Sequence, residues 1–229
     1  MQIRQQAMHA PQPQEAQMKE ARMKEREELE LRIRTLCTEG ESNRAAELAL
    51  EVYGTDILKF ILSVLREPEQ ANDVFAIFRE NLLRGLPRFR WESSLRTWAY
   101  RVARNACYEA LRSPVSREEP VSQVKLPDEA QRERTQTHPW QRTEVKDRFR
   151  ALREQLTLEE RTLLQLRVDQ ELSWVEVARV LAGDDEDLSR SELERRAMAL
   201  RQQYHRLKER LRALAQQEGL IPSGEQPEA

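Results

Sequence analysis

Cysteine, histidine, glycine and long apolar runs are all scarce in this sequence. The two cysteines, Cys37 and Cys107, follow neither a metal-ligand spacing nor a secreted-domain pattern, which is typical of a reducing compartment. The three histidines are scattered, and no glycine-rich phosphate loop or Cys/His/carboxylate cluster is present. No apolar run reaches the roughly 18 residues of a membrane span, and the N-terminus lacks a signal-peptide core. These absences predict a cytoplasmic protein that is not an enzyme and has no metal, cofactor or membrane partner.

The small number of glycines also indicates the fold class. Of six glycines, five stand where apolar helical patterns stop, as helix C-caps do: Gly40, Gly54, Gly85, Gly183 and Gly219. Charged residues make up 34% of the chain and hydrophobic residues 39%, a composition that does not favour one large core. The net charge of −2 excludes a freestanding DNA coater, so any basic patch must be local. We therefore expect an all-α protein.

The helical periodicity falls into two sets separated by a proline-containing stretch. It predicts helices over 26–40, 42–52, 57–65, 74–86 and 94–112, and then over 145–156, 157–168, 173–183 and 189–214. Capping boxes mark three of the starts, at Thr157, Ser173 and Ser189. We expect two small helical domains, 27–112 and 140–217, a flexible linker over 113–139, a mobile tail and solvated helix over 1–26, and a C-terminal tail over 218–229. Because the linker could extend to about 85 Å, the two domains could sit far apart on one partner.

The predicted helix over 94–112 has two unlike faces. One is apolar and includes Leu95 and Trp98, and it must be buried. Seven arginines against two glutamates lie between Arg84 and Arg112, interleaved with aromatics. Guanidinium groups pair with phosphate and aromatic rings stack on unpaired bases, for about 1–3 kcal/mol each, so this face predicts single-stranded nucleic acid. The alternative is an ordinary solvated helix whose arginines pair with acids elsewhere.

The second constellation is a short helix followed by a long basic one. Between Arg190 and Arg212 eight basic residues stand against three glutamates. This is the plan of a helix-turn-helix, whose second helix reads the major groove, although about 12 residues with four acids separate the two apolar patterns. The alternative is a coiled-coil segment with a solvated face. The candidate duplex-reading residues are Arg201, Gln202, Gln203, His205, Arg206 and Lys208.

Two stretches together resemble a known family. "EPEQANDVFAIFRENLLRGLPRFRWESSLRTWAYRVARNACYEALR" resembles the second domain of bacterial RNA polymerase sigma factors of the sigma-70 family, extracytoplasmic-function (ECF) type. "LTLEERTLLQLRVDQELSWVEVARVL" with "LRQQYHRLKERLRAL" is similar to their fourth domain. The resemblance implies a sigma factor that binds core RNA polymerase and directs promoter-specific transcription initiation, with an anti-sigma factor as a further candidate partner.

The resemblance also implies roles for particular residues. The helix over 72–86 would dock the polymerase clamp helices, the loop over 89–94 would capture a flipped base of the minus-ten element, and the fourth domain would bind the polymerase flap and the minus-thirty-five element. The implied clamp-binding residues are Asp73, Val74, Ala76, Ile77, Glu80, Asn81 and Arg84. The implied minus-ten residues are Arg88, Arg90, Trp91, Glu92, Ser93, Ser94, Arg96, Thr97, Tyr100, Arg101, Arg104, Asn105 and Tyr108.

The sequence departs from the family pattern at three places. Ala76 and Ile77 replace a common Gln-Glu pair, which predicts a more apolar polymerase contact. Trp91 replaces a common glycine in the base-capturing loop, and we expect it to stack on or wedge a base. The insertion "GDDEDLSRSELERRAMA" lengthens the turn before the reading helix. The rival functions are a stand-alone helix-turn-helix regulator that binds duplex DNA without polymerase, and a helical adaptor for an acidic protein.

Overall fold

The computed structural model describes residues 13–112, 152, 155–182 and 188–220, and within these ranges the regular elements are helices, without a strand. The predicted all-α class is confirmed. None of the helices in the described ranges is long and apolar enough to span a membrane. The elements are α1 (Pro13–Thr38), α2 (Ser42–Leu65), α3 (Pro68–Gly85), the 3-10 turn η1 (Leu86–Arg88), α4 (Leu95–Arg112), α7 (Leu158–Leu164), the π-helical turn η2 (Gln165–Asp169), α8 (Trp174–Leu181) and α9 (Arg190–Gln217).

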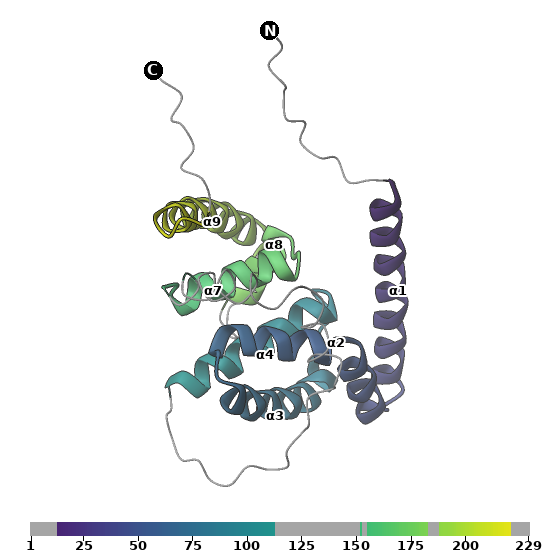
Figure 1. The fold of residues 1–229 in the computed structure, drawn as a ribbon. Coiled ribbons are helices and arrows are strands. Elements are labelled where there is room, and N and C mark those ends of the chain that lie inside the picture. The colour runs from purple at the N-terminus through teal and green to yellow at the C-terminus, as the bar shows by residue number, and fades with distance from the viewer. Residues whose placement is uncertain (1–12, 113–151, 153–154, 183–187, 221–229) are drawn as a thin grey trace.

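Helices α2, α3 and α4 pack into a bundle around a shared apolar core, and α1 stands beside it (Figure 1). Tyr100 of α4 meets Phe60 of α2 edge-on, with ring centroids 5.4 Å apart. Ile33 of α1 is fully buried in the same core. The amphipathic periodicity of the sequence thus positions the whole N-terminal bundle.

One of the glycines that the sequence predicts at helix ends, Gly54, lies inside a helix instead. Gly40 does end α1, with a φ of +81° that glycine adopts without strain. Gly54, by contrast, is buried inside α2, so the two helices expected over 42–52 and 57–65 form one. A Cβ at Gly54 would lie 3.7 Å from the Phe75 ring of α3, so the glycine marks a helix contact. Arg66 takes the left-handed cap position of α2 instead, with a φ of 69°.

The predicted starts of the C-terminal helices are confirmed. Thr157 and Ser173 each form a complete capping box with the glutamate three residues later, and the Ser189 side chain accepts the Glu192 N–H. Between α7 and α8, η2 inserts a π-helical turn that the sequence pattern did not indicate. The predicted linker 113–139, most of the helix predicted over 145–156 and the acidic turn 183–187 lie outside the described residues.

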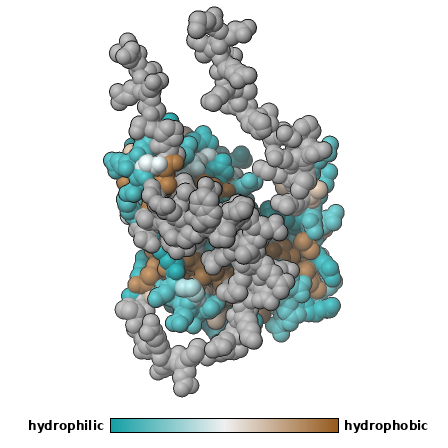
Figure 2. Space-filling view, in the orientation of Figure 1, coloured by the Kyte–Doolittle hydropathy of each residue, from teal (hydrophilic) through white to brown (hydrophobic). Residues whose placement is uncertain are grey.

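The two halves of the chain share one core. Helix α8 packs on α4, and a single cluster of buried apolar side chains joins the N-terminal bundle to Leu163, Leu166, Leu172, Val177 and Val180 (Figure 1). Helix α9 lies across the far side of α7 and α8, so the chain forms layers from α3 through α4 and α8 to α9. Figure 2 shows hydrophilic residues over α9 and hydrophobic ones gathering at the level of α4. The wide separation that the sequence allowed is therefore not the arrangement of this structure.

Candidate nucleic-acid interface

The loop between η1 and α4 carries a short stack of aromatic rings. Phe89 stacks on Trp98 of α4 with ring centroids 4.9 Å apart, and the Trp91 ring, tilted by 51°, lies 4.9 Å from Phe89. Gly85 makes room for this stack, because a Cβ there would lie only 2.8 Å from Trp98 Cζ2. Trp98 is 8% exposed and belongs to the core, whereas Phe89 and Trp91 are half-buried and within reach of solvent.

Trp91 itself has a strained backbone. Its φ of 59° lies in the left-handed region, which a bulky L-residue rarely adopts. Strain of this kind persists only where surrounding contacts hold it, and it concentrates at functional sites. The flanking Arg90 and Glu92 are exposed and form an ion pair at 3.5 Å. Arg88 is exposed as well, so the loop presents one aromatic ring between three charged side chains.

Ser94 ends the loop and starts α4. Its Oγ accepts the Thr97 N–H at 3.1 Å, which satisfies one of the free amides of the first helical turn. Ser93 and Ser94 are both half-buried. The residues predicted to capture a base therefore lie together on a defined turn, Arg88 to Ser94.

The predicted strand-binding face of α4 is not open to solvent. Thr97 is 1% exposed and Tyr100 is fully buried, contrary to the expectation that both lie on a solvated face. The remaining residues predicted on this face are half-buried: Arg96, Arg101, Arg104, Asn105 and Tyr108. The reason is the packing of α8 on α4, which no local pattern in α4 could indicate.

Polar contacts join this face of α4 to the C-terminal helices. The Arg96 guanidinium donates to the Gln170 carbonyl oxygen at 2.7 Å and to Gln170 Oε1 at 3.3 Å, and Tyr100 Oη donates to the same Oε1. Thr97 Oγ1 donates to Glu176 Oε1 at 3.2 Å. Burial raises the pKa of Tyr100, so its hydroxyl stays protonated and remains a donor. Gln170, only 8% exposed, is thus the central acceptor of the contact.

Further along α4, Arg104 and Tyr108 form a second pair. The Arg104 guanidinium lies 4.1 Å from the centroid of the Tyr108 ring and donates to Asn105 Oδ1 at 3.0 Å. Within the described part of the chain, Arg104 Nε and Tyr108 Oη are buried and have no hydrogen-bond partner. A buried donor without an acceptor is costly, so this part of α4 is suited to a ligand that supplies acceptors.

The residues predicted to read duplex DNA are all exposed on α9. They are Arg201, Gln202, Gln203, His205, Arg206 and Lys208. Three of them line an open cavity of about 810 Å³ between α9 and the segment that links α7 to α8. Within it the Arg167 and Arg201 guanidinium groups lie over the Trp174 ring, at 5.1 and 5.9 Å from its centroid. The sequence reasoning missed Trp174 and Arg167, because they are brought to α9 by tertiary packing.

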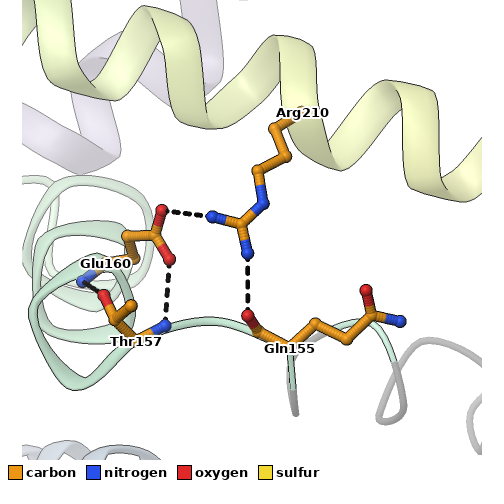
Figure 3. Close-up of polar contacts among 4 residues, drawn as sticks. All are labelled: Gln155, Thr157, Glu160 and Arg210. Atoms are coloured by element: carbon orange, nitrogen blue, oxygen red, sulfur yellow. Dashed lines mark hydrogen bonds and ion pairs between the residues drawn. The ribbon is translucent and has the colours of Figure 1, made fainter.

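A polar bridge fixes the far end of α9 to α7 (Figure 3). Arg210 donates to Glu160 Oε1 at 2.7 Å and to the Gln155 carbonyl oxygen at 2.8 Å. The other carboxylate oxygen of Glu160 accepts the Thr157 N–H of the capping box at 2.9 Å. Glu160 therefore both caps the N-terminus of α7 and holds α9 against it.

The residues predicted to bind polymerase divide into two groups on α3. Val74 is 1% exposed and belongs to the core, so its side chain is not available to a partner, contrary to the expectation. Asp73, Glu80 and Arg84 are exposed, and the last two form an ion pair at 2.6 Å. Ala76 and Asn81 are half-buried, while Ile77 is 39% exposed. Leu83, which the sequence reasoning did not select, is 43% exposed and adds to the apolar surface of α3.

One protein-family model matches part of the N-terminal bundle. Residues 50–116 match Sigma-70 region 2. The matched region 2 segment contains most of α2, all of α3, η1 and α4, and the loop that carries Trp91. Among curated proteins, none matches the chain. The match makes this part of the chain similar to region 2 of sigma-70 family sigma factors.

Proposed function

We propose that this protein is an ECF-type sigma factor that binds core RNA polymerase and directs initiation at promoters with minus-ten and minus-thirty-five elements. The observation that carries the proposal is the region 2 match, which contains both the exposed apolar surface of α3 and the aromatic loop before α4. The exposed basic residues of α9 support a second, duplex-binding domain.

Polymerase binds the surface of α3. Ile77 and Leu83 are large apolar residues exposed by 39% and 43%, and they share this helix with the ionic pair of Glu80 and Arg84. Because residues three apart are neighbours on a helix, Glu80 lies between Ile77 and Leu83, and this surface of α3 offers a partner both apolar and charged side chains. Docking through α3 uses neither Phe89 nor Trp91 of the loop that follows η1, so these two rings remain available to DNA.

Base capture is the role of the loop and α4. Trp91 and Phe89 provide rings on which an unpaired base stacks for about 1–3 kcal/mol, and Arg88 and Arg90 provide cations for its phosphates. Opening each duplex step costs about 1.4 kcal/mol, so a few captured bases do not sustain a longer bubble. The polymerase therefore contributes the rest of the free energy, in agreement with the near-neutral charge of the chain.

Strand binding along α4 requires the C-terminal helices to leave it. The groups of Arg96, Thr97 and Tyr100 that would contact the strand are engaged by Gln170 and Glu176. We infer that the structure represents a closed form and that binding to separate sites on polymerase holds α4 and α8 apart. The loop with Trp91 lies outside the α4–α8 contact and is the first part to meet DNA.

One observation favours a second candidate, the stand-alone duplex-binding regulator. In the closed form α9 exposes all six predicted reading residues while the strand-binding face of α4 is covered. A protein in this form would bind duplex without melting it. The helical adaptor has no such support among the described contacts.

In vitro transcription from a randomised promoter library, with core polymerase alone and with the protein added, separates the two candidates. A sigma factor gives protein-dependent transcripts with two enriched elements about two duplex turns apart. Replacing Ile77 and Leu83 with Ser removes these transcripts but keeps duplex binding, whereas replacing Arg201 and Gln202 with Ala weakens selection of the upstream element alone. Duplex binding without any protein-dependent transcript refutes the sigma function and supports the regulator.

A further inference from the structure

Helix α1 reaches the base-capturing loop through two side chains one turn apart, Glu30 and Arg34. Glu30 contacts the first turn of α4, and Arg34 contacts Trp91. Both contacts join a helix outside the region 2 match to the part of region 2 that meets DNA.

Glu30 acts on the start of α4. Its Oε1 atom accepts the Arg96 backbone N–H at 3.0 Å and the Tyr53 hydroxyl at 3.0 Å. An N–H in the first helical turn has no intrahelical acceptor, and a carboxylate is favourable at that end of the helix dipole. Tyr53 is buried in α2, and this burial, together with Glu30, raises the pKa of its hydroxyl. Tyr53 therefore fixes the carboxylate that caps α4.

Arg34 acts on the loop itself. Its guanidinium carbon lies 5.6 Å from the centroid of the Trp91 ring, within the range of a cation–π contact. Arg34 is exposed, so it adds little to the core. It lies over the one loop residue whose backbone has a left-handed φ, and Phe89 packs on the same ring. The ring is thus held between α1 and Phe89 in a conformation that it would not keep alone.

We propose that Glu30 and Arg34 are positioning residues for base capture, which set the orientation of Trp91 and the start of α4 before DNA arrives. The inference rests on the proposed sigma function and gives α1 a part in it. A preset ring lowers the ordering cost of stacking a flipped base, since its side chain and backbone are already fixed. Without the two contacts, Trp91 relaxes to other conformations and only a fraction of molecules present the ring.

The test uses the full chain with core polymerase and a promoter that carries the fluorescent base 2-aminopurine in the minus-ten element. Arg34→Gln removes the cation from an exposed position, and Arg34→Lys restores it. Arg32→Gln is the matched control, because Arg32 is exposed on the same helix. Glu30→Gln keeps an acceptor for Tyr53 but removes the charge from the α4 terminus. The readouts are the 2-aminopurine signal of the captured base, the affinity for core polymerase and the affinity for duplex minus-thirty-five DNA.

We expect Arg34→Gln to reduce base capture about two- to fivefold, the equivalent of one cation–π contact, with both affinities unchanged. Arg34→Lys should recover part of the signal, and Arg32→Gln should match the wild type. Equal base capture by wild type and Arg34→Gln overturns the positioning role and leaves the sigma function intact. A loss of polymerase affinity in step with base capture also overturns it, because the contact would then be structural. If the wild-type chain gives no captured base with polymerase, both proposals fail.

Discussion

Gln170 is the residue through which the closed form can be tested most directly. Its Oε1 atom accepts from Tyr100 and from Arg96, and Tyr100 is fully buried. Gln170→Ala leaves the Tyr100 hydroxyl without an acceptor, which costs about 1–3 kcal/mol, while Arg96 keeps its bond to the Gln170 carbonyl oxygen. A cost of about 2 kcal/mol falls on the closed form alone, because water satisfies the hydroxyl once α8 leaves. The ratio of closed to open molecules then falls about 30-fold.

The assay is binding of a fluorescent single strand carrying the minus-ten sequence to the free chain, followed by anisotropy, with small-angle scattering to detect expansion. Where the closed form dominates, the apparent affinity rises with the open fraction, so Gln170→Ala should bind the strand up to about 30-fold more tightly. Asp169→Ala is the matched control, since Asp169 is the exposed neighbour of Gln170. Unchanged strand affinity in a variant that retains its helical circular dichroism refutes the reasoning. A second result would also refute it: Gln170→Ala unfolds in a single transition at lower denaturant concentration and gains no affinity for the strand. The packing of α4 on α8 would then be a permanent part of the core.

Three further predictions concern the loop and its support. Gly85→Ala places a Cβ 2.8 Å from Trp98 and should lower the free energy of unfolding, measured with denaturant, by about 1–3 kcal/mol. Gly54→Ala, whose added Cβ meets ordinary contact distances, should lower it by less. Equal losses would contradict the close packing at Gly85. The Trp91→Gly variant should be about 1 kcal/mol more stable than the Trp91→Ala variant. Both lose the ring, but only glycine adopts a φ of 59° without strain. The reverse order of stability would refute the claim that the backbone at Trp91 is strained. Burial raises the pKa of Cys107 to about 12, so its thiolate is scarce below that pH, and labelling of Cys107 with a thiol reagent at pH 8 should follow unfolding. Cys37 is only half-buried, so the labelled cysteine is identified by peptide mapping, and fast labelling of Cys107 in the folded chain would contradict the prediction.

Local signals in the sequence predicted local structure well. The glutamate three residues after Thr157 or Ser173 fixed those helix starts, because a capping box is complete within four residues. The prediction that Gly54 ends a helix was wrong, because its small size allows α2 to contact Phe75 of α3 and does not mark a turn. The burial of Tyr100 could not be predicted either, because its acceptor is Gln170, 70 residues further along the chain. The accessibility of the predicted site residues therefore depends on tertiary contacts that local sequence patterns do not show.

The C-terminal helices offer α4 the same kind of group that a DNA strand would offer, namely hydrogen-bond acceptors. A strand offers phosphate and base acceptors to Arg96, Thr97 and Tyr100; in the closed form a main-chain carbonyl, an amide oxygen and a carboxylate take those places. Glu176 links this contact to the helix start, because one of its oxygens accepts from Thr97 and the other from the Ser173 N–H of the capping box. The Arg96 terminal nitrogen and the Thr97 and Tyr100 hydroxyls thus have acceptors in the closed form, whereas Arg96 Nε and Arg104 Nε have none there among the described residues. Under the proposed function, opening loses the apolar burial between the two helices, and binding to polymerase must offset this loss.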